Sequence, residues 1–184
     1  EPAPIARMNL TVLGAGAWGT ALAVSACGRQ PTRLWARDAA QAVLMRDTRR
    51  NRRYLPDVAL PGSLQINTDF DAAVAHAHGG LVVVATPMSG LEGVLRRLTP
   101  DAFGVLWLCK GFQEGTGRLG HEIARELRPH AHAGVLSGPS FAEEVARGQP
   151  TALVAASADE ALRELAAQTL HGPALRIYTS ADPV

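Results

Sequence analysis

The segment LGAGAWG occupies residues 13–19 and carries three glycines in the order G-x-G-x-x-G. It follows an apolar run, Asn9–Leu13, that predicts a β-strand. It leads into an alanine-rich run, Thr20–Cys27, that predicts a helix ended by Gly28. Because this glycine pattern binds phosphate when it lies between a strand and a helix, the segment predicts the opening unit of an α/β domain.

The three glycines have separate physical roles in such a turn. Gly14 permits a tight turn, Gly16 lets the backbone approach a pyrophosphate, and Gly19 lets the helix pack closely on the strand. The free N–H groups and the dipole at the helix start then receive the phosphate charge. A glycine turn of an ordinary α/β protein is the alternative, but the flanking strand and helix favour dinucleotide binding.

Apolar runs and helical patterns alternate along the rest of the chain. The predicted strands lie at residues 32–36, 81–85, 104–108, 134–136, 152–156 and 175–178. The predicted helices lie at residues 39–49, 69–77, 90–98, 117–127, 140–147 and 159–170, with an irregular stretch at 51–61. This order predicts a Rossmann-type α/β fold, a doubly wound and mostly parallel sheet with helices on both faces. We expect residues 1–7 to be an N-terminal extension and residues 8–184 to form one NAD(P)-binding domain.

The composition argues against several classes of function. The 184 residues carry a formal net charge of +1, so the sequence has no basic surplus and we expect no nucleic-acid partner. No apolar run approaches the roughly 20 residues of a membrane helix. The two cysteines, Cys27 and Cys109, predict reduced thiols in a cytoplasmic protein. Two His-x-His pairs, at 76/78 and 130/132, lack a clear third ligand, so we expect no metal site.

The end of the second predicted strand bears on the choice of dinucleotide. An NAD site usually places an acidic residue there to bind the ribose 2′-hydroxyl, whereas an arginine accommodates the 2′-phosphate of NADP. This strand is followed by Arg37 and then by Asp38, and Arg52 and Arg53 add positive charge further on. The order favours NADPH over NADH. The alternative is that Arg37 stacks on adenine or faces water.

Lys110 is the one lysine among 18 basic residues, the other 17 being arginines. It follows the predicted buried strand at 104–108, and in a doubly wound sheet the carboxyl ends of the strands form the ligand crevice. A compact ammonium there attracts a substrate phosphate or polarises a carbonyl. The alternative is a surface lysine whose stem packs on apolar atoms.

A second glycine turn, SGPS at residues 137–140, lies between a predicted short strand and a predicted short helix. Ser140 is the expected cap of that helix, with Glu143 three residues on as the partner of a capping box. Exposed N–H groups at such a helix start suit a substrate anion. A helix that is merely capped is the alternative.

Five segments, in this order and spacing, resemble the bacterial NAD(P)-dependent glycerol-3-phosphate dehydrogenases. They are GAGAWGTALA at 14–23, LWARD at 34–38, NRRYLP at 51–56, CKGF at 109–112 and SGPSFAEEVARGQPTA at 137–152. The resemblance runs from Met8 to the end of the chain. It implies reversible hydride transfer between dihydroxyacetone phosphate and sn-glycerol 3-phosphate at the start of phospholipid synthesis.

The resemblance also implies site residues. To the cofactor contacts of Gly14, Gly16 and Gly19 it adds Ala17, Trp18, Arg37, Tyr54, Lys110 and Ala142. To the substrate it assigns Lys110, Gly138 and Ser140. Two departures are small: Ala17 stands where serine is common, and Cys109 stands where threonine is usual.

A third departure is large. The family's general acid/base is a second lysine in a later glycine-rich segment, and we expect this chain to end before it and before the helical C-terminal domain. No catalytic residue is therefore expected here, and the piece should bind nucleotide but turn over little. The full-length enzyme should be a homodimer, and this piece should be a monomer.

Two other functions are compatible with the sequence. One is a related NAD(P)-dependent dehydrogenase acting on a hydroxy acid or a sugar nucleotide, since one fold carries many chemistries. The other is a stand-alone dinucleotide-sensing module. The turns at Lys110 and at 137–140 argue for the glycerol-3-phosphate enzyme over both.

Overall fold

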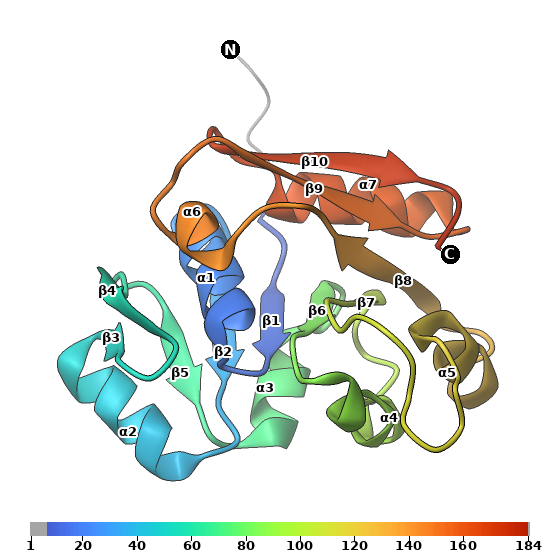
Figure 1. Ribbon diagram of the computed structural model, residues 1–184, viewed down its shortest axis with the longest axis horizontal. Helices are drawn as coiled ribbons and strands as arrows, with labels where there is room; N and C mark the ends of the chain where they lie inside the picture. Colours follow the sequence, from blue (N-terminus) through green and yellow to red (C-terminus); the bar gives the residue numbers. More distant parts are fainter. Residues whose placement is uncertain (1–6, 184) are drawn as a thin grey trace.

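A computed structural model describes residues 7–183, built around an eight-stranded sheet (Figure 1). In spatial order its strands are β10 (Leu175–Ser180), β9 (Thr151–Ala156), β8 (His132–Ser137), β7 (Gly104–Trp107), β6 (Leu81–Val84), β1 (Leu10–Leu13), β2 (Thr32–Trp35) and β5 (Gln65–Asn67). A separate two-stranded sheet pairs β3 (Arg50–Asn51) with β4 (Leu55–Ala59). The helices are α1 (Ala17–Ala26), α2 (Ala39–Thr48), α3 (Phe70–His76), α4 (Met88–Arg97), α5 (Gly120–Leu127), α6 (Ala142–Ala146) and α7 (Glu160–Leu170).

The sheet is doubly wound about its two central strands. From β1 the chain proceeds outward through β2 to β5, then returns to β6 and proceeds the other way to β7 and β8. All pairs in the sheet are parallel except β8 with β9. Leu10 aligns with both Thr32 and Leu81, so the carboxyl ends of β2, β1 and β6 lie level. The predicted Rossmann-type fold is confirmed, and the strand order reverses between β1 and β6.

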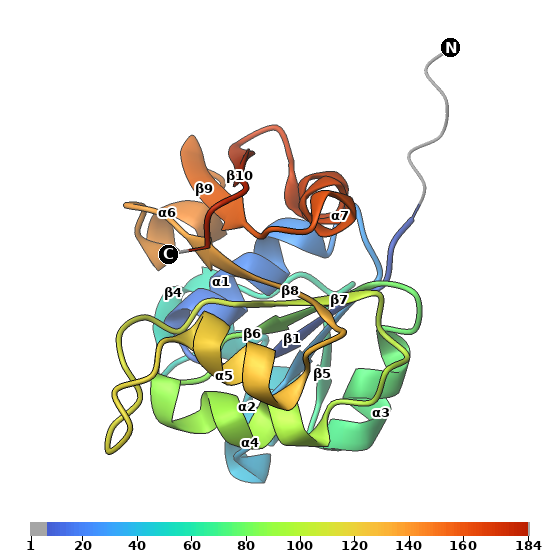
Figure 2. The ribbon, with the colours of Figure 1, turned by 90° about the vertical axis from the view of Figure 1, so that its right-hand side faces the viewer.

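Helices cover both faces of the sheet. Figure 2 shows α1, α6 and α7 on one side and α3, α4 and α5 on the other. The all-apolar strand β6 explains why two layers are needed. Leu81 and Val83 belong to the core under α1 and α7, while Val82 and Val84 belong to the core over α4 and α5, and all four are fully buried. Burying each such side chain contributes about 1.5–3 kcal/mol.

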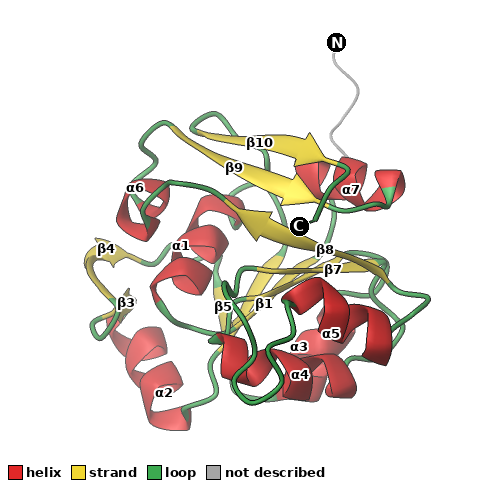
Figure 3. Cartoon of the chain, turned by 45° about the vertical axis from the view of Figure 1, so that its right-hand side comes forward, coloured by secondary structure: helices red, strands yellow, loops and turns green. Residues whose placement is uncertain are grey.

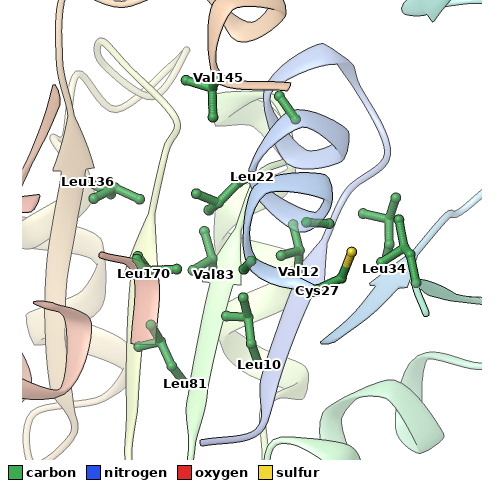
Figure 4. Packing of buried hydrophobic residues seen from close by; sticks show 14 of the residues in the cluster. Leu10, Val12, Leu22, Cys27, Leu34, Leu81, Val83, Leu136, Val145 and Leu170 are labelled. Atoms are coloured by element: carbon green, nitrogen blue, oxygen red, sulfur yellow. The ribbon is translucent and has the colours of Figure 1, made fainter. Parts of the chain in front are cut away.

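The core under α1 fixes the helix that carries the glycine motif. In Figure 4, Leu22 of α1 lies next to Val83 of β6, with Val12 of β1 beside them. These three side chains have no exposed surface. The helix start is therefore held at one place relative to the ends of β1 and β6.

The stretch at 51–61 is more ordered than the sequence indicates. The prediction of an irregular stretch is wrong, because β4 pairs with β3 there, and β5 follows as a further parallel strand beside β2. Figure 3 shows β3 and β4 beside α2, outside the main sheet. Arg49 makes the turn from α2 into β3 with a left-handed φ of 51°. β3 and β5 have only two and three residues, and Pro56 interrupts the pattern of β4.

Other helices and strands begin or end a few residues away from their predicted bounds. α1 begins at Ala17 rather than Thr20. α5 begins at Gly120 rather than at Gly117. Gly117 has a φ of 68°, and its own N–H donates to the Gln113 carbonyl, so this residue closes a loop before the helix. β8 extends over His132–Ser137, twice the predicted length.

Candidate functional site

The glycine turn lies against the end of β6, at the point where the strand order reverses. Gly14 has a φ of 124°, which L side chains rarely adopt, and its N–H donates to the Trp35 carbonyl at 3.0 Å. A Cβ on Gly14 would lie 2.7 Å from the carbonyl carbon and oxygen of Ala85. Ligands of open α/β sheets bind in the crevice at this reversal point, so the turn lies in the expected place.

The space around Gly16 is open, whereas that around Gly19 is filled. A Cβ on Gly19 would lie 2.0 Å from the Gly14 carbonyl oxygen, so glycine is required for the turn to close onto α1. A Cβ on Gly16 would meet nothing within 4 Å. Gly16 is the N-cap of α1, no side chain caps it, and the first turn has no acidic residue. The helix N–H groups and dipole therefore face open space that suits a phosphate, as the motif predicts.

A buried amide network supports the turn from the other side. Asn51 is 1% exposed, and its Nδ2 donates to the Ala15 carbonyl at 2.9 Å and to Thr20 Oγ1 at 2.8 Å. The Nε2 of Gln41 donates to the same Ala15 carbonyl at 3.0 Å. Neither side chain was predicted from the sequence. Asn51 opens the NRRYLP segment, but no local pattern indicates that it or Gln41 bonds to Ala15.

The predicted adenosine contacts lie on the β2 side of this network. Arg37 is exposed after β2, and Asp38 is the N-cap of α2, accepting from the Ala40 and Gln41 N–H groups at 2.9 and 3.3 Å. Tyr54 is 43% exposed, and its N–H donates to Asn51 Oδ1 at 3.3 Å. The acidic residue after β2 is thus engaged in capping a helix, and Arg37 faces solvent.

The ends of β6 and β7 add a thiol, a hydroxyl and a cation. Thr86 Oγ1 is buried without a hydrogen-bond partner in the described part of the chain. Desolvation raises the pKa of the neighbouring Cys109 thiol to about 11. Lys110 is exposed, and among residues 7–183 no hydrogen bond or ion pair engages its ammonium. Its position beyond the carboxyl end of β7 is the one that the sequence predicts.

The turn at 137–140 is held by β9. A Cβ on Gly138 would lie 2.8 Å from the Ala152 carbonyl oxygen, and Ser140 Oγ donates to that same oxygen at 3.0 Å. The predicted cap is wrong: the N-cap of α6 is Phe141, whose N–H donates to Glu144 Oε2 at 3.2 Å. Packing on β9 shifts the start of α6 by two residues, because it commits the Ser140 hydroxyl to Ala152.

The remaining predicted residues lie around α1. Ala17 and Trp18 form its first turn and are half-buried, with Trp18 packed on the core under α1. Ala142 begins α6, which lies beside α1 in Figure 1. The fold thus gathers the glycine turn, Lys110 and the 137–140 turn at the carboxyl edge of one sheet. It places Tyr54 on the separate β3–β4 unit.

The two His-x-His pairs contribute nothing to this edge. His76 Nε2 lies 3.0 Å from the Pro31 carbonyl oxygen, and His132 Nδ1 contacts the Asp159 carboxylate. Within the described residues, no three His, Cys, Asp or Glu side chains gather to hold a metal ion. Cys27 and Cys109 are both free thiols. No helix of residues 7–183 is long and apolar enough to cross a membrane.

Comparison with known proteins gives a consistent result. Residues 9–163 match the model of the family described as NAD-dependent glycerol-3-phosphate dehydrogenase N-terminus. Glycerol-3-phosphate dehydrogenase [NAD(P)+] of Methylibium petroleiphilum is 64% identical over 179 residues, covering 96% of this chain and 54% of that protein. The counterpart in Leptothrix cholodnii is 58% identical over 188 residues, covering 96% and 56%.

Solved structures point to the same family. The crystal structure of glycerol-3-phosphate dehydrogenase from Coxiella burnetii superposes with a TM-score of 0.86 at 30% identity, covering 95% of this chain and 54% of that one. A UDP-glucose dehydrogenase from Pyrobaculum islandicum shares the fold, with a TM-score of 0.70 at 17% identity, covering 100% and 48%. The chain spans about half the length of the curated relatives that it matches. On these findings the chain belongs to the family of NAD-dependent glycerol-3-phosphate dehydrogenase N-terminal domains.

Proposed function

We propose that this chain is the cofactor-binding part of an oxidoreductase that transfers a hydride between NAD(P)H and dihydroxyacetone phosphate, giving sn-glycerol 3-phosphate. The observation that carries the proposal is the uncapped start of α1. It faces open space at Gly16, at the reversal point of the sheet, in a chain of this family. A helix start that presents N–H groups and no carboxylate binds a pyrophosphate.

The residues present fit a nicotinamide dinucleotide. The turn of Gly14, Gly16 and Gly19 would hold the pyrophosphate with the N–H groups of Ala17 and Trp18, while Ala142 would line the same site from α6. The backbone of Thr86 lies beside this turn, because Thr86 N would be 3.0 Å from a Cβ on Gly14. When bound, the cofactor supplies the hydride.

The cofactor is NADPH in preference to NADH in this proposal. An NAD site uses a carboxylate after the second strand to bind the ribose hydroxyls. Asp38 caps α2 with Oδ1 instead, while Arg37 is exposed beside it. Tyr54 would lie near the adenosine end.

The substrate is held at the carboxyl ends of β7 and β8. The Lys110 ammonium has no partner within residues 7–183, so it is available to a phosphate or a carbonyl oxygen. Gly138 and Ser140 would bind the substrate from the next strand end. No residue of this chain is proposed as the general acid/base, which the resemblance assigns to a later segment of the whole protein. The whole enzyme would be a cytoplasmic homodimer that supplies glycerophospholipid synthesis.

Substrate profiling of the full-length protein tests this proposal. We expect NADPH-dependent reduction of dihydroxyacetone phosphate to exceed that of 2-oxo acids and to run in reverse with sn-glycerol 3-phosphate. Lys110→Met should lower kcat/KM by about 100-fold or more, since removing one electrostatic donor at a reacting oxygen slows catalysis by about that factor. Preference for a hydroxy acid or a UDP-sugar would reject the substrate and keep the fold.

A further inference from the structure

A cavity of about 390 Å³ lies between the first turns of α2 and the segment that begins with β3. We call it the α2–β3 cavity, and its lining includes Asp38, Gln41, Leu44, Arg50, Arg52 and Arg53. It adjoins the glycine turn, because Gln41 and Asn51 both line it and both donate to the Ala15 carbonyl. It therefore opens on the side of the crevice where Arg37 and Asp38 follow β2.

The charge of this cavity is strongly positive. Three of its residues are arginines, and its one carboxylate, Asp38, binds two backbone N–H groups of α2. Arg50 is committed, since its guanidinium donates to the Pro56 carbonyl at 3.1 Å.

Arg52 and Arg53 are uncommitted. Both are exposed, and neither donates a hydrogen bond nor forms an ion pair with any other residue in the 7–183 range. The Arg53 guanidinium carbon lies 5.1 Å from the centroid of the Tyr54 ring. That contact limits where the guanidinium can lie while leaving its N–H groups free.

Donors of this kind discriminate between the two dinucleotides. A ribose 2′-hydroxyl needs an acceptor such as a free carboxylate, whereas a 2′-phosphate needs several fixed N–H donors. Arginine presents five donors in a planar fork that matches phosphate oxygens in pairs. Arg52 and Arg53 offer two such guanidinium groups to the cavity, and the one carboxylate in its lining, Asp38, caps α2.

We propose that Arg52 and Arg53 are specificity-determining residues that select the 2′-phosphate of NADPH from the β3 side of the crevice, in addition to Arg37 after β2. This inference rests on the proposed cofactor function and extends it to residues that the resemblance does not assign. One cation, Arg37, follows β2, and two, Arg52 and Arg53, follow β3. Asn51 holds the β3 side to the glycine turn, so the distance from the 2′-phosphate site to the pyrophosphate site is fixed.

The test compares the chain with its Arg52→Gln/Arg53→Gln variant by calorimetric titration with NADPH, NADH, adenosine 2′,5′-bisphosphate and 5′-AMP. The variant should bind NADPH and the bisphosphate at least about tenfold more weakly, because it loses charged hydrogen bonds. Its affinity for NADH and 5′-AMP should stay within about twofold. Arg52→Lys/Arg53→Lys should keep part of the preference, since it restores charge without the fork.

Arg125→Gln is the matched control, since it removes one exposed arginine from α5 on the far face of the sheet. It should leave all four affinities unchanged. Equal weakening of NADPH and NADH in the double variant would overturn the selectivity role while leaving the proposed function in place. Failure of the unaltered chain to bind either dinucleotide would instead reject the proposed function. Unchanged melting temperatures identify any loss as one of binding.

Discussion

Asn51 is hydrogen-bonded to Ala15 across 36 positions of sequence, with Nδ2 of the amide 2.9 Å from the carbonyl oxygen. The same Nδ2 reaches Thr20 Oγ1 in α1, and its Oδ1 accepts from the Tyr54 N–H. One buried amide thus links the glycine turn, the helix that follows it and the β3–β4 unit. The geometry of the proposed phosphate site depends on a residue outside the glycine motif.

Replacing this amide should destabilise the fold. Asn51→Asp puts a carboxylate oxygen in place of Nδ2, facing the Ala15 carbonyl oxygen, so the chain loses that buried hydrogen bond and gains a repulsive contact between two acceptors, whereas the Thr20 hydroxyl can turn to donate. We expect the free energy of unfolding to fall by about 2–3 kcal/mol in urea denaturation at pH 7. Asn67→Asp is the control, because Asn67 is half-buried at the end of β5 and should cost about 0.5 kcal/mol or less. Equal effects of the two substitutions would contradict the linking role.

Alanine substitutions at two of the motif glycines should separate folding from binding. Gly19→Ala places a methyl group 2.0 Å from the Gly14 oxygen and should destabilise the chain by at least about 2 kcal/mol. Gly16→Ala meets open space with an extended backbone, φ −76°, so the melting temperature should barely change. Its methyl group would nevertheless occupy the phosphate approach, and NADPH affinity should fall. A stable Gly19→Ala chain, or full affinity in Gly16→Ala, would contradict these roles.

The Cys109 thiol should resist alkylation at moderate pH. Its pKa is raised to about 11 by burial, so at pH 8 only about one thiol in a thousand is the reactive thiolate. We expect iodoacetamide labelling of Cys109, followed by peptide mass spectrometry, to be slow at pH 8 and to accelerate steeply towards pH 10.5. The urea-unfolded chain provides the reference for an ordinary cysteine. Labelling at pH 8 as fast as in that reference would show that the thiol is not buried.

Stability should depend on pH through Asp159. The hydrogen bond from His132, and then that from the Leu162 N–H, hold the pKa of this carboxyl below its usual value. A lowered carboxyl pKa contributes stability that is fully present above the unfolded value near 4, and this stability is lost as pH falls through the folded value. Urea unfolding at pH 7, 5, 4 and 3 should therefore show a smaller acid loss in Asp159→Asn, which can still cap α7. Parallel pH curves for the two chains would refute the assignment.

Elements with an uninterrupted apolar or glycine pattern could be predicted from the sequence, and those without one could not. The apolar run of β6 and the glycine turn before α1 have strong patterns, and both lie where they were expected. The strands β3 and β5 have two and three residues, β4 contains Pro56, and all three form by pairing, β3 with β4 and β5 with β2. Tertiary contact, not local propensity, decides their structure.

Long-range hydrogen bonds explain the errors in the site. Ser140 has the residue type and the spacing of a helix cap, but its hydroxyl binds Ala152 of β9, so α6 starts later. Asn51 and Gln41 bind Ala15 at separations of 36 and 26 residues, which no local motif reveals. By contrast, the position of Lys110 followed from the strand pattern alone, because the carboxyl end of a buried strand faces the crevice.

We propose above all that this chain binds a nicotinamide dinucleotide at the glycine turn, with Arg37 at the adenosine end. Calorimetric titration of the chain with NADPH and with NADH, repeated on Arg37→Asp, tests it most directly. The account predicts saturable one-to-one binding of NADPH, tighter than that of NADH, and a preference that disappears in the variant. Absence of saturable binding for both dinucleotides would contradict the account.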